Sequence, residues 1–350
     1  MYSRVYIEIT NICNMNCSFC HGHSRAARRM SRDEFSLVLD KLRGVTNYVY
    51  FHLMGEPLTH PDLPEFIKMA AERGFKPMIT TNGTLLSRRG GEILASSGDF
   101  IPNFCNSLIQ SGESGANVAD VSKNSVNICS SPQEINLQSA GKICKSGGED
   151  TTNADCLLQS GDNIVKSTQK PYLHKINISL HSFEGDDAEK YRKYLSDIAN
   201  FAKIASAAGV IVVLRLWNKG FDGGNNDVAL NFLREHIDGE WAENTRGLRI
   251  REKLFLEWGD RFAWPDSEVA CFGDEVTCYG LRDHFGILSD GTIVPCCLDS
   301  DGVIALGNIF TDDIDRVLSS DRAVAMKRGF ECRRATEELC RRCGYAQRFV

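Results

Sequence analysis

Strand-like and helix-like stretches alternate through the first hundred residues. Three short apolar or β-branched runs are typical of strands: Val5–Ile9, Tyr48–Met54 and Pro77–Thr81. A helix is predicted to begin at Ser31, because Ser31 and Glu34 have the spacing of a capping box ahead of apolar residues at helical spacing. Further helices are predicted over residues 64–73 and 90–96.

The same alternation resumes after residue 172. Strands are predicted over 175–180, 210–217 and 253–258, with helices over 187–208 and 227–236 between them. Residues 210–214 are continuously apolar, as expected for a parallel strand buried on both faces. Six strand–helix units in series predict a parallel α/β fold.

A segment of different composition separates these halves. Between Cys105 and Pro171 there is no aromatic residue and no Arg, His or Met, while Ser, Asn, Gly and Gln dominate. Such a segment buries little apolar surface, so residues 99–172 are interpreted as an insertion. In a β/α barrel, the loop it occupies lies on the face opposite the active site. Its four cysteines have no metal-binding spacing and are interpreted as free thiols: Cys105, Cys129, Cys144 and Cys156.

Composition and charge narrow the class of protein. The chain is 42% hydrophobic and 25% charged, with a net charge of −6, which disfavours a nucleic-acid binder. The dense basic stretch, formed by Arg25, Arg28, Arg29 and Arg32, is interpreted as a solvated helix start rather than a site for an anionic substrate. No apolar run is long enough for a membrane span and no signal peptide is recognisable, so we expect a cytoplasmic protein.

Cysteines supply the strongest chemical signal. Fourteen are present, and in a reducing compartment clustered cysteines indicate metal or redox chemistry. Cys13, Cys17 and Cys20 lie within eight residues directly after the first strand. Three thiolates can hold an iron–sulfur cube with one iron left open for a ligand. The alternative is a zinc site completed by His21 or His23.

The spacing Cys-x3-Cys-x2-Cys, with Phe19 before the last cysteine, resembles the signature of the radical S-adenosylmethionine (SAM) superfamily. That resemblance implies a partial (β/α)6 TIM-like barrel over residues 1–258, interrupted by the insertion. It also implies a [4Fe-4S] cluster that binds SAM, with Phe19 among the residues near the cofactor.

Other strand ends resemble further motifs of that family. Met54-Gly55-Glu56-Pro57 resembles its Gly-Gly-Glu-Pro motif, which implies that Gly55, Glu56 and Pro57 receive the amino group of SAM. Thr81-Asn82-Gly83-Thr84, after the third strand, is also common in the family. Ser179 and Asn218 stand at positions implied to contact the SAM carboxylate and ribose.

Two residues near the strand ends are candidates for catalysis. Arg215 lies in an apolar strand, where it either points into the barrel to hold a carboxylate of cofactor or substrate, or extends outward to solvent. His181 is either functional or a hydrogen-bonded histidine at the barrel edge.

The C-terminal region, residues 259–350, carries a second cysteine set. Cys278 and Cys296 flank a predicted hairpin, and Cys340 and Cys343 form a Cys-x2-Cys knuckle. The set resembles the auxiliary-cluster domain called SPASM, or its shortened form, twitch, which implies one auxiliary [4Fe-4S] cluster. A structural zinc site is the alternative. Cys271, Cys297 and Cys332 are further candidate ligands.

The resemblance implies a function. A radical SAM enzyme cleaves SAM reductively to a 5′-deoxyadenosyl radical and abstracts hydrogen from its substrate. We expect an oxidation or cross-linking of a small molecule or peptide, assisted by the auxiliary cluster, with a flavodoxin- or ferredoxin-type electron donor. No extra domain precedes the first strand, which slightly favours a small molecule or a peptide supplied by a partner. The rival class is a non-catalytic iron–sulfur or zinc protein that transfers electrons or binds partners.

Overall fold

The computed structural model describes residues 1–95, 171–183 and 187–349. These residues belong to one compact unit, Met1–Ile101 with Thr168–Val350. Almost all of the predicted insertion lies outside the described residues, as do its four cysteines. The predicted boundary between a core barrel and a C-terminal domain near residue 258 stays a prediction.

Eleven described strands form one sheet, in the order β11-β10-β9-β1-β2-β3-β4-β5-β8-β7-β6. Six of them, β1, β2, β3, β4, β5 and β8, are consecutive and parallel, which confirms the predicted α/β fold with a parallel sheet. The strands are β1 (Arg4–Ile7), β2 (Tyr48–Tyr50), β3 (Lys76–Thr81), β4 (Lys175–Ser179), β5 (Ile211–Lys219), β6 (Ala242–Asn244), β7 (Gly247–Arg251), β8 (Leu254–Asp260), β9 (His284–Ile287), β10 (Thr292–Val294) and β11 (Gly307–Asn308).

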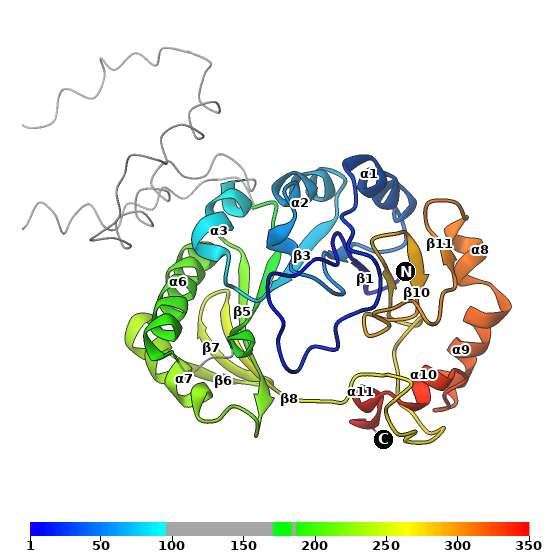
Figure 1. Ribbon diagram of the computed structural model, residues 1–350. Helices are drawn as coiled ribbons and strands as arrows, with labels where there is room; N and C mark the ends of the chain where they lie inside the picture. Colours follow the sequence, from blue (N-terminus) through cyan, green and yellow to red (C-terminus); the bar gives the residue numbers. More distant parts are fainter. Residues whose placement is uncertain (96–170, 184–186, 350) are drawn as a thin grey trace, which may run out of the picture. The chain divides into compact units, whose positions relative to one another are not determined.

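Helices follow five of the parallel strands and cover the outer side of the curved sheet (Figure 1). They are α1 (Arg32–Lys41), α2 (Leu63–Glu72), α3 (Leu86–Ala95), α6 (Ala188–Ala207) and α7 (Asn225–His236). Helix α1 begins where the sequence predicts, because the Ser31 side chain accepts from the Glu34 N–H while Glu34 accepts from the Ser31 N–H. Among the described residues no helix follows β8, which leads instead into a linker.

The C-terminal region extends the same sheet. The predicted hairpin forms as β9 and β10, and β9 pairs in parallel with β1, from Arg4 opposite His284 to Ile7 opposite Ile287. After β11 the chain forms α8 (Ile314–Leu318), α9 (Asp321–Glu331), α10 (Glu338–Arg341) and α11 (Gly344–Gln347). The pairing of β9 with β1 was not predicted, and it places the second cysteine set beside the first strand.

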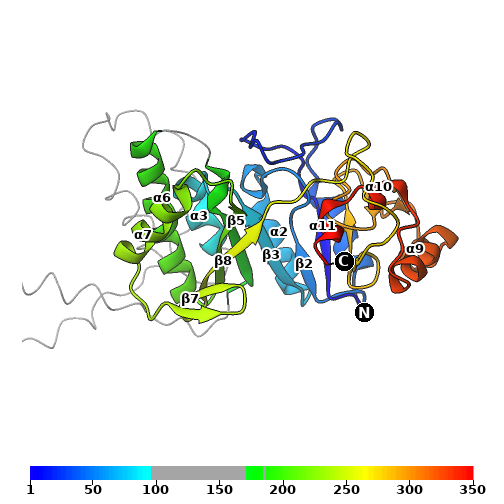
Figure 2. The same cartoon turned by 90° about the horizontal axis from the view of Figure 1, so that it is seen from below.

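The carboxyl ends of the parallel strands lie together at one end of the sheet. Figure 2 shows the loop that follows β1 at that end, opposite the chain's N-terminus. Parallel β/α folds place their functional loops there. None of the described helices has the length and apolar character needed to cross a membrane.

Candidate functional site

The loop between β1 and α1, which we call the cysteine loop (residues 10–29), is closed at its neck by side chains. The Thr10 hydroxyl donates to the Arg28 carbonyl at 3.1 Å. The Asn11 amide donates to the Ala26 carbonyl at 2.8 Å and accepts from the Arg28 N–H at 2.7 Å. These bonds hold both arms together, so the residues between them project as one unit.

The three predicted cluster ligands lie in the part of the loop beyond that neck. Cys13 and Cys20 are exposed and Cys17 is half-buried. The Cys17 thiol donates to the carbonyl of Ser182 at 3.6 Å, at the end of β4. Burial raises the pKa of Cys13, and the negative charges of Glu56 and Cys20 raise it further. Three thiols on one closed loop are a donor set that fits an iron–sulfur cube.

No set of three His, Cys, Asp or Glu side chains in the described part of the chain is arranged to hold a metal ion. Cluster binding by Cys13, Cys17 and Cys20 therefore stays a prediction.

The segment Gly55-Glu56-Pro57 packs against the neck of the cysteine loop. Gly55 has a φ of +75°, and a Cβ there would lie 2.4 Å from the Thr10 carbonyl oxygen, so no larger residue fits without backbone movement. The Glu56 N–H donates to the Ile12 carbonyl at 2.9 Å. Pro57 begins the short 3₁₀ helix η1 (Pro57–Thr59). The motif thus lies directly beside the residues that precede Cys13.

The Glu56 carboxylate is buried, with 2% of the residue exposed. It accepts from the N–H groups of Leu58 at 3.0 Å and Asn82 at 2.7 Å, so it joins the end of β2 to the end of β3. Burial raises the pKa of Glu56 to about 7, although these hydrogen bonds act in the opposite direction. In this arrangement the side chain fixes the two strand ends, and its predicted contact with SAM stays a prediction.

A pocket opens beside the cysteine loop, at the ends of β4 and β5. Its lining includes Ser18, His181, Asn218 and Arg261. The Asn218 Oδ1 is buried and has no hydrogen-bond partner within the described ranges. An unsatisfied buried acceptor costs free energy, so this oxygen fits a donor from a bound ligand, such as a ribose hydroxyl. Asn218 therefore lines a pocket that offers its oxygen to a ligand, and its predicted contact with the SAM ribose stays a prediction.

His181, which lines this pocket, packs against Phe19 of the cysteine loop, with ring centroids 4.9 Å apart. The His181 Nδ1 lies 3.1 Å from the Arg215 carbonyl and 3.3 Å from the Trp217 nitrogen. These contacts with the backbone of β5 hold the His181 ring at the barrel edge. They fit the interpretation of His181 as a hydrogen-bonded histidine at that edge. Ser179 is half-buried and does not line this pocket, and its carbonyl accepts from the Tyr194 hydroxyl at 3.2 Å.

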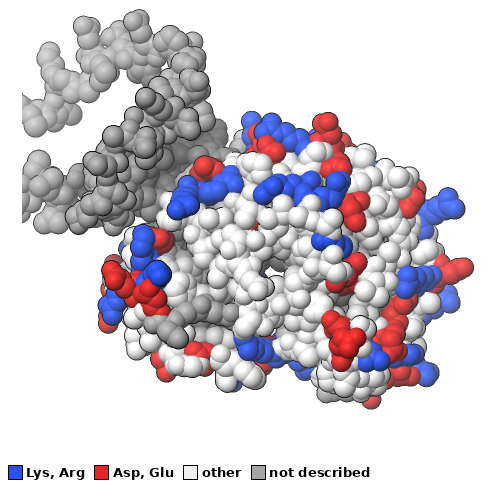
Figure 3. All heavy atoms as spheres, in the orientation of Figure 1, with Lys and Arg blue, Asp and Glu red and all other residues white. Residues whose placement is uncertain are grey.

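The linker after β8 braces the cysteine loop from the other side. The Trp264 Nε1 donates to the Phe19 carbonyl at 3.0 Å, and the Arg261 guanidinium lies 5.6 Å from the Phe19 ring centroid. Figure 3 shows that the middle of this face of the molecule, where Figure 1 places the cysteine loop, carries few charged side chains.

A buried carboxylate joins the cysteine loop to the C-terminal region. Glu8 is fully buried, and one of its oxygens accepts from Arg25 at 2.6 Å and from the Met54 N–H at 3.4 Å. Its other oxygen accepts from the N–H of Ser289 at 3.1 Å and from its hydroxyl at 2.9 Å. Arg25 also donates to the Ser300 carbonyl at 2.8 Å. Four separate segments therefore meet at Glu8.

This network corrects the interpretation of the basic stretch as a solvated helix start. Arg25 is largely buried against Glu8, and Arg28 donates to the Ser289 carbonyl at 2.7 Å. Arg32 does fit the expectation, since it is exposed and paired with Asp62. No local pattern in the sequence signals the Glu8 contact, because its partners come from distant segments.

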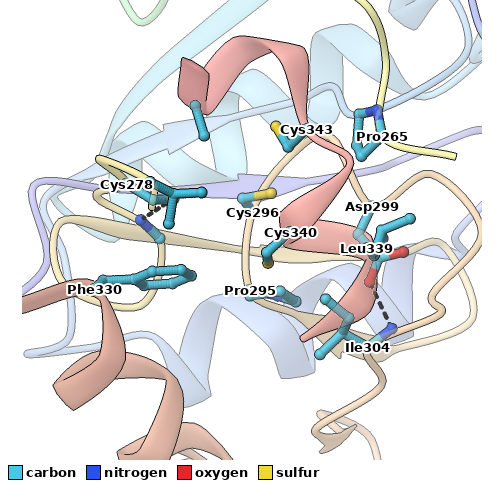
Figure 4. Close-up of a pocket in the computed structure, with 13 residues that line it drawn as sticks. Pro265, Cys278, Pro295, Cys296, Asp299, Ile304, Phe330, Leu339, Cys340 and Cys343 are labelled. Carbon is cyan, nitrogen blue, oxygen red and sulfur yellow. Dashed lines mark hydrogen bonds between the residues drawn. The ribbon is translucent and has the colours of Figure 1, made fainter. Parts of the chain in front are cut away.

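The four predicted auxiliary ligands surround one pocket. Figure 4 shows Cys278, Cys296, Cys340 and Cys343 around it, from the segments before β9, after β10 and along α10–α11. Apart from Asp299, the remaining lining is Gly280 and apolar residues: Pro265, Val276, Pro295, Ile304, Phe330, Leu339 and Ala346. Four thiols around a largely apolar pocket are a donor set suited to a cluster, and their binding of one stays a prediction, since no described set of side chains is arranged to hold a metal ion.

Burial dominates the acid–base properties of these thiols. Burial is the largest cause and neighbouring cysteines add to it, so the pKa of Cys278 is raised to about 11 and that of Cys296 well above its usual range. Thiolates crowded in an apolar pocket need a compensating positive charge, which a bound metal would supply. Cys297 does not line the pocket and lies in hydrogen-bonding reach of the Tyr6 hydroxyl instead. Cys271 and Cys332 are exposed.

Apart from Arg215, which was a candidate for it, sequence reasoning missed the polar interior of the barrel. Alternate residues of β1, β2, β4 and β5 face this interior, among them Tyr6, Tyr50, His52, Lys175 and Arg215. Arg215 follows its inward alternative, since its guanidinium lies near Tyr6, Tyr50 and His52. A signal was present: these positions alternate with Ile, Val and Leu along strands that otherwise appear fully apolar.

Comparisons with known proteins agree with this arrangement. Residues 7–107 match the model of the radical SAM superfamily, and residues 278–344 match that of the SPASM iron-sulfur cluster-binding domain. The AdoMet-dependent heme synthase of Methanosarcina barkeri is 33% identical over 94 residues, which are 26% of this chain and 27% of that protein. The tungsten-containing aldehyde ferredoxin oxidoreductase cofactor-modifying protein of Pyrococcus furiosus is 35% identical over 88 residues, 24% of each chain. The alignments thus span about a quarter of these curated relatives.

Among solved structures, Streptococcus suis SuiB is similar in fold, with a TM-score of 0.51 at 16% identity over 98% of this chain and 71% of SuiB. SuiB bound to S-adenosylmethionine gives a TM-score of 0.50 at 17% identity, over 98% of this chain and 72% of SuiB.

Proposed function

Because this chain belongs to the radical SAM superfamily and carries a C-terminal SPASM iron-sulfur cluster-binding domain, we propose that it is an enzyme that cleaves SAM reductively. Its reaction is the oxidation or cross-linking of a small-molecule or peptide substrate. When bound, the cluster and SAM supply a 5′-deoxyadenosyl radical that takes hydrogen from the substrate. The observation that carries this proposal is the cysteine loop closed against Gly55 and Glu56, next to the pocket that contains Asn218.

The chain's own residues have separate tasks in this proposal. Cys13, Cys17 and Cys20 hold the cluster at the tip of the loop and leave one iron open to SAM. Gly55 allows the strand end to approach the loop, and Glu56 keeps the ends of β2 and β3 in register. These contacts preorganise the site, so the position of SAM is fixed before the reaction begins.

The pocket beside the loop receives the nucleoside part of SAM. Asn218 would accept from the ribose through its unsatisfied Oδ1, and His181, packed against Phe19, lines the same pocket. Ser179, at the end of β4, lies near the SAM carboxylate. A flavodoxin- or ferredoxin-type protein supplies the electron.

The four buried thiols hold one auxiliary [4Fe-4S] cluster, for which Cys278, Cys296, Cys340 and Cys343 are the ligands. Strand β9 follows Cys278 closely in the chain and pairs with β1, so these thiols would hold a cluster beside the barrel. Such a cluster would supply an electron acceptor, which suits a substrate that loses two electrons in all.

Electron paramagnetic resonance tests the proposal on the reconstituted full chain. The reduced protein should show two cluster signals, and SAM should change one of them, because SAM binds the open iron. Cys17→Ala should remove the signal that SAM changes and leave the other. A spectrum that SAM leaves unaltered in a protein with about eight irons would contradict the proposal.

A further inference from the structure

The interior of the barrel is lined by polar and aromatic side chains instead of packed aliphatic ones. Outward-facing residues such as Ile7, Val49 and Leu214 are fully buried beneath the helices. The inward-facing residues between them are only half-buried. TIM-type barrels are commonly filled by Val, Ile and Leu, whereas these inner side chains are polar or aromatic and keep part of their surface accessible. We call this inner face the barrel chamber, and its residues are Tyr6, Tyr50, His52, Lys175 and Arg215.

Three rings form one wall of the barrel chamber. The Tyr6 and Tyr50 centroids are 5.2 Å apart, and the His52 ring lies 5.6 Å from each. The His52 Nδ1 is buried without a hydrogen-bond partner in the described part of the chain. Burial, with the charge of Arg215, lowers the pKa of His52 to about 3, so this imidazole is neutral.

Arg215 points into the barrel chamber. Its guanidinium carbon lies 4.5 Å from the Trp217 ring centroid, and its Nε is buried with no hydrogen-bond partner among the residues described. Burial lowers the pKa of Arg215, while Glu257 and the two tyrosines act in the opposite direction. A buried guanidinium N–H without an acceptor is costly, and an anion is the group that satisfies it best.

The charge around Arg215 is unbalanced. Lys175 and Arg4 also face the interior, and Arg4 is hydrogen-bonded to Tyr50. Burial lowers the pKa of Lys175, and the nearby Arg215 lowers it further. Against these three cations the interior offers the carboxylate of Glu257, on β8 opposite Arg215. The barrel chamber therefore has an excess of positive charge, which attracts an anion.

We propose that the barrel chamber binds the substrate through an oxyanion group, a carboxylate or a phosphate, held by Arg215 and Lys175 beside the Tyr6–Tyr50–His52 rings. This inference rests on the proposed function, of which it defines the substrate class. We assign this anion to the substrate; if the SAM carboxylate occupies Arg215 instead, SAM should abolish binding of anionic probes.

Fluorine NMR with three probes of one shape tests this proposal on the reconstituted full chain. The probes are para-fluorobenzoate, para-fluorophenyl phosphate and the uncharged para-fluorobenzamide. The fluorine signal of at least one anion should broaden as protein is added, and that anion should bind more tightly than the amide. The tighter of the two anions distinguishes carboxylate from phosphate. Equal binding of the amide and both anions, or no binding of any probe, would overturn the proposal.

Variants assign the binding to the barrel chamber. Arg215→Gln should lower the affinity for the preferred anion by about tenfold or more, as expected for loss of a charge-assisted hydrogen bond. Arg249→Gln, which removes an exposed arginine of β7, should not change it. Unchanged affinity in a folded Arg215→Gln protein would refute the assignment. Lys175→Met provides a second test if Arg215→Gln does not fold, and it too should weaken the anion.

The anion-binding measurement does not depend on SAM cleavage. Anion binding that depends on Arg215, in a protein that forms no 5′-deoxyadenosine, would leave the site intact and reject the enzymatic proposal. SAM cleavage with no selectivity for the anions would do the reverse.

Discussion

Removing Arg25 should destabilise the protein more than removing an arginine at its surface. Arg25 is the cationic partner of Glu8, which has no exposed surface and accepts from three different segments. In Arg25→Met the carboxylate keeps its bonds to Met54 and Ser289 and loses its charged partner. The arginine bond to the Ser300 carbonyl is also lost. The substitution therefore leaves an uncompensated buried charge.

The size of the effect follows from that burial. Breaking a buried ion pair on one side costs about 3–5 kcal/mol, whereas exposed pairs contribute about 0–1 kcal/mol. One kcal/mol shifts the melting midpoint of a domain of this size by about 2 °C, so Arg25→Met should melt about 6–10 °C lower. Arg249→Met is the matched control, since Arg249 and Glu240 form an ion pair with both side chains at least half exposed. It should melt within about 2 °C of the native chain.

Anaerobic calorimetry at one scan rate and equal iron content measures both variants. Adding Glu8→Gln to Arg25→Met should recover part of the loss, because no buried charge remains unpaired. The Glu8 network does not join the cysteine loop to the C-terminal region as described if Arg25→Met has the same melting midpoint as the control. The same conclusion follows if adding Glu8→Gln to Arg25→Met does not raise the melting midpoint.

Three further outcomes are expected. Gly55→Ala should lower the melting midpoint clearly more than Gly44→Ala, because both have positive φ but only at Gly55 would a Cβ meet backbone atoms; equal losses would contradict this. Burial raises the pKa of Glu56 to about 7 from 4.5, so the folded state binds the proton more tightly. Stability should fall by up to about 3 kcal/mol as pH rises from 4.5 to 7 and then level, and Glu56→Gln should flatten this dependence in melts across that range. Cys296→Ala should lose about four irons by colorimetric assay while Cys297→Ala keeps them, and the opposite result would reassign the ligand.

Local and periodic features of the sequence predicted much of the fold. The capping box of Ser31 and Glu34 forms as expected, and the apolar run after Val210 becomes β5. The cysteine loop and the hairpin between Cys278 and Cys296 also appear where the patterns place them. Each of these depends on residues close together in the chain, where propensity and spacing carry the information.

Contacts between distant segments could not be predicted in this way. The pairing of β9 with β1 joins residues far apart in the sequence, and the same is true of Glu8 and Ser289. The barrel chamber is a partial exception. The alternation of Tyr6 and Arg215 with apolar neighbours separates the two faces of each strand, and an inward Arg215 is one of its predicted alternatives, but the pattern within one strand does not identify its partners on the others.

Formation of 5′-deoxyadenosine from SAM tests the central claim most directly. The reconstituted chain, given a strong reductant and SAM without air, should produce it, and mass spectrometry measures the amount. Cys17→Ala should produce none, whereas Cys296→Ala should still cleave SAM, because the auxiliary ligands do not hold the SAM-binding cluster. No 5′-deoxyadenosine from a native chain with its iron intact, or equal amounts from Cys17→Ala, would contradict the account.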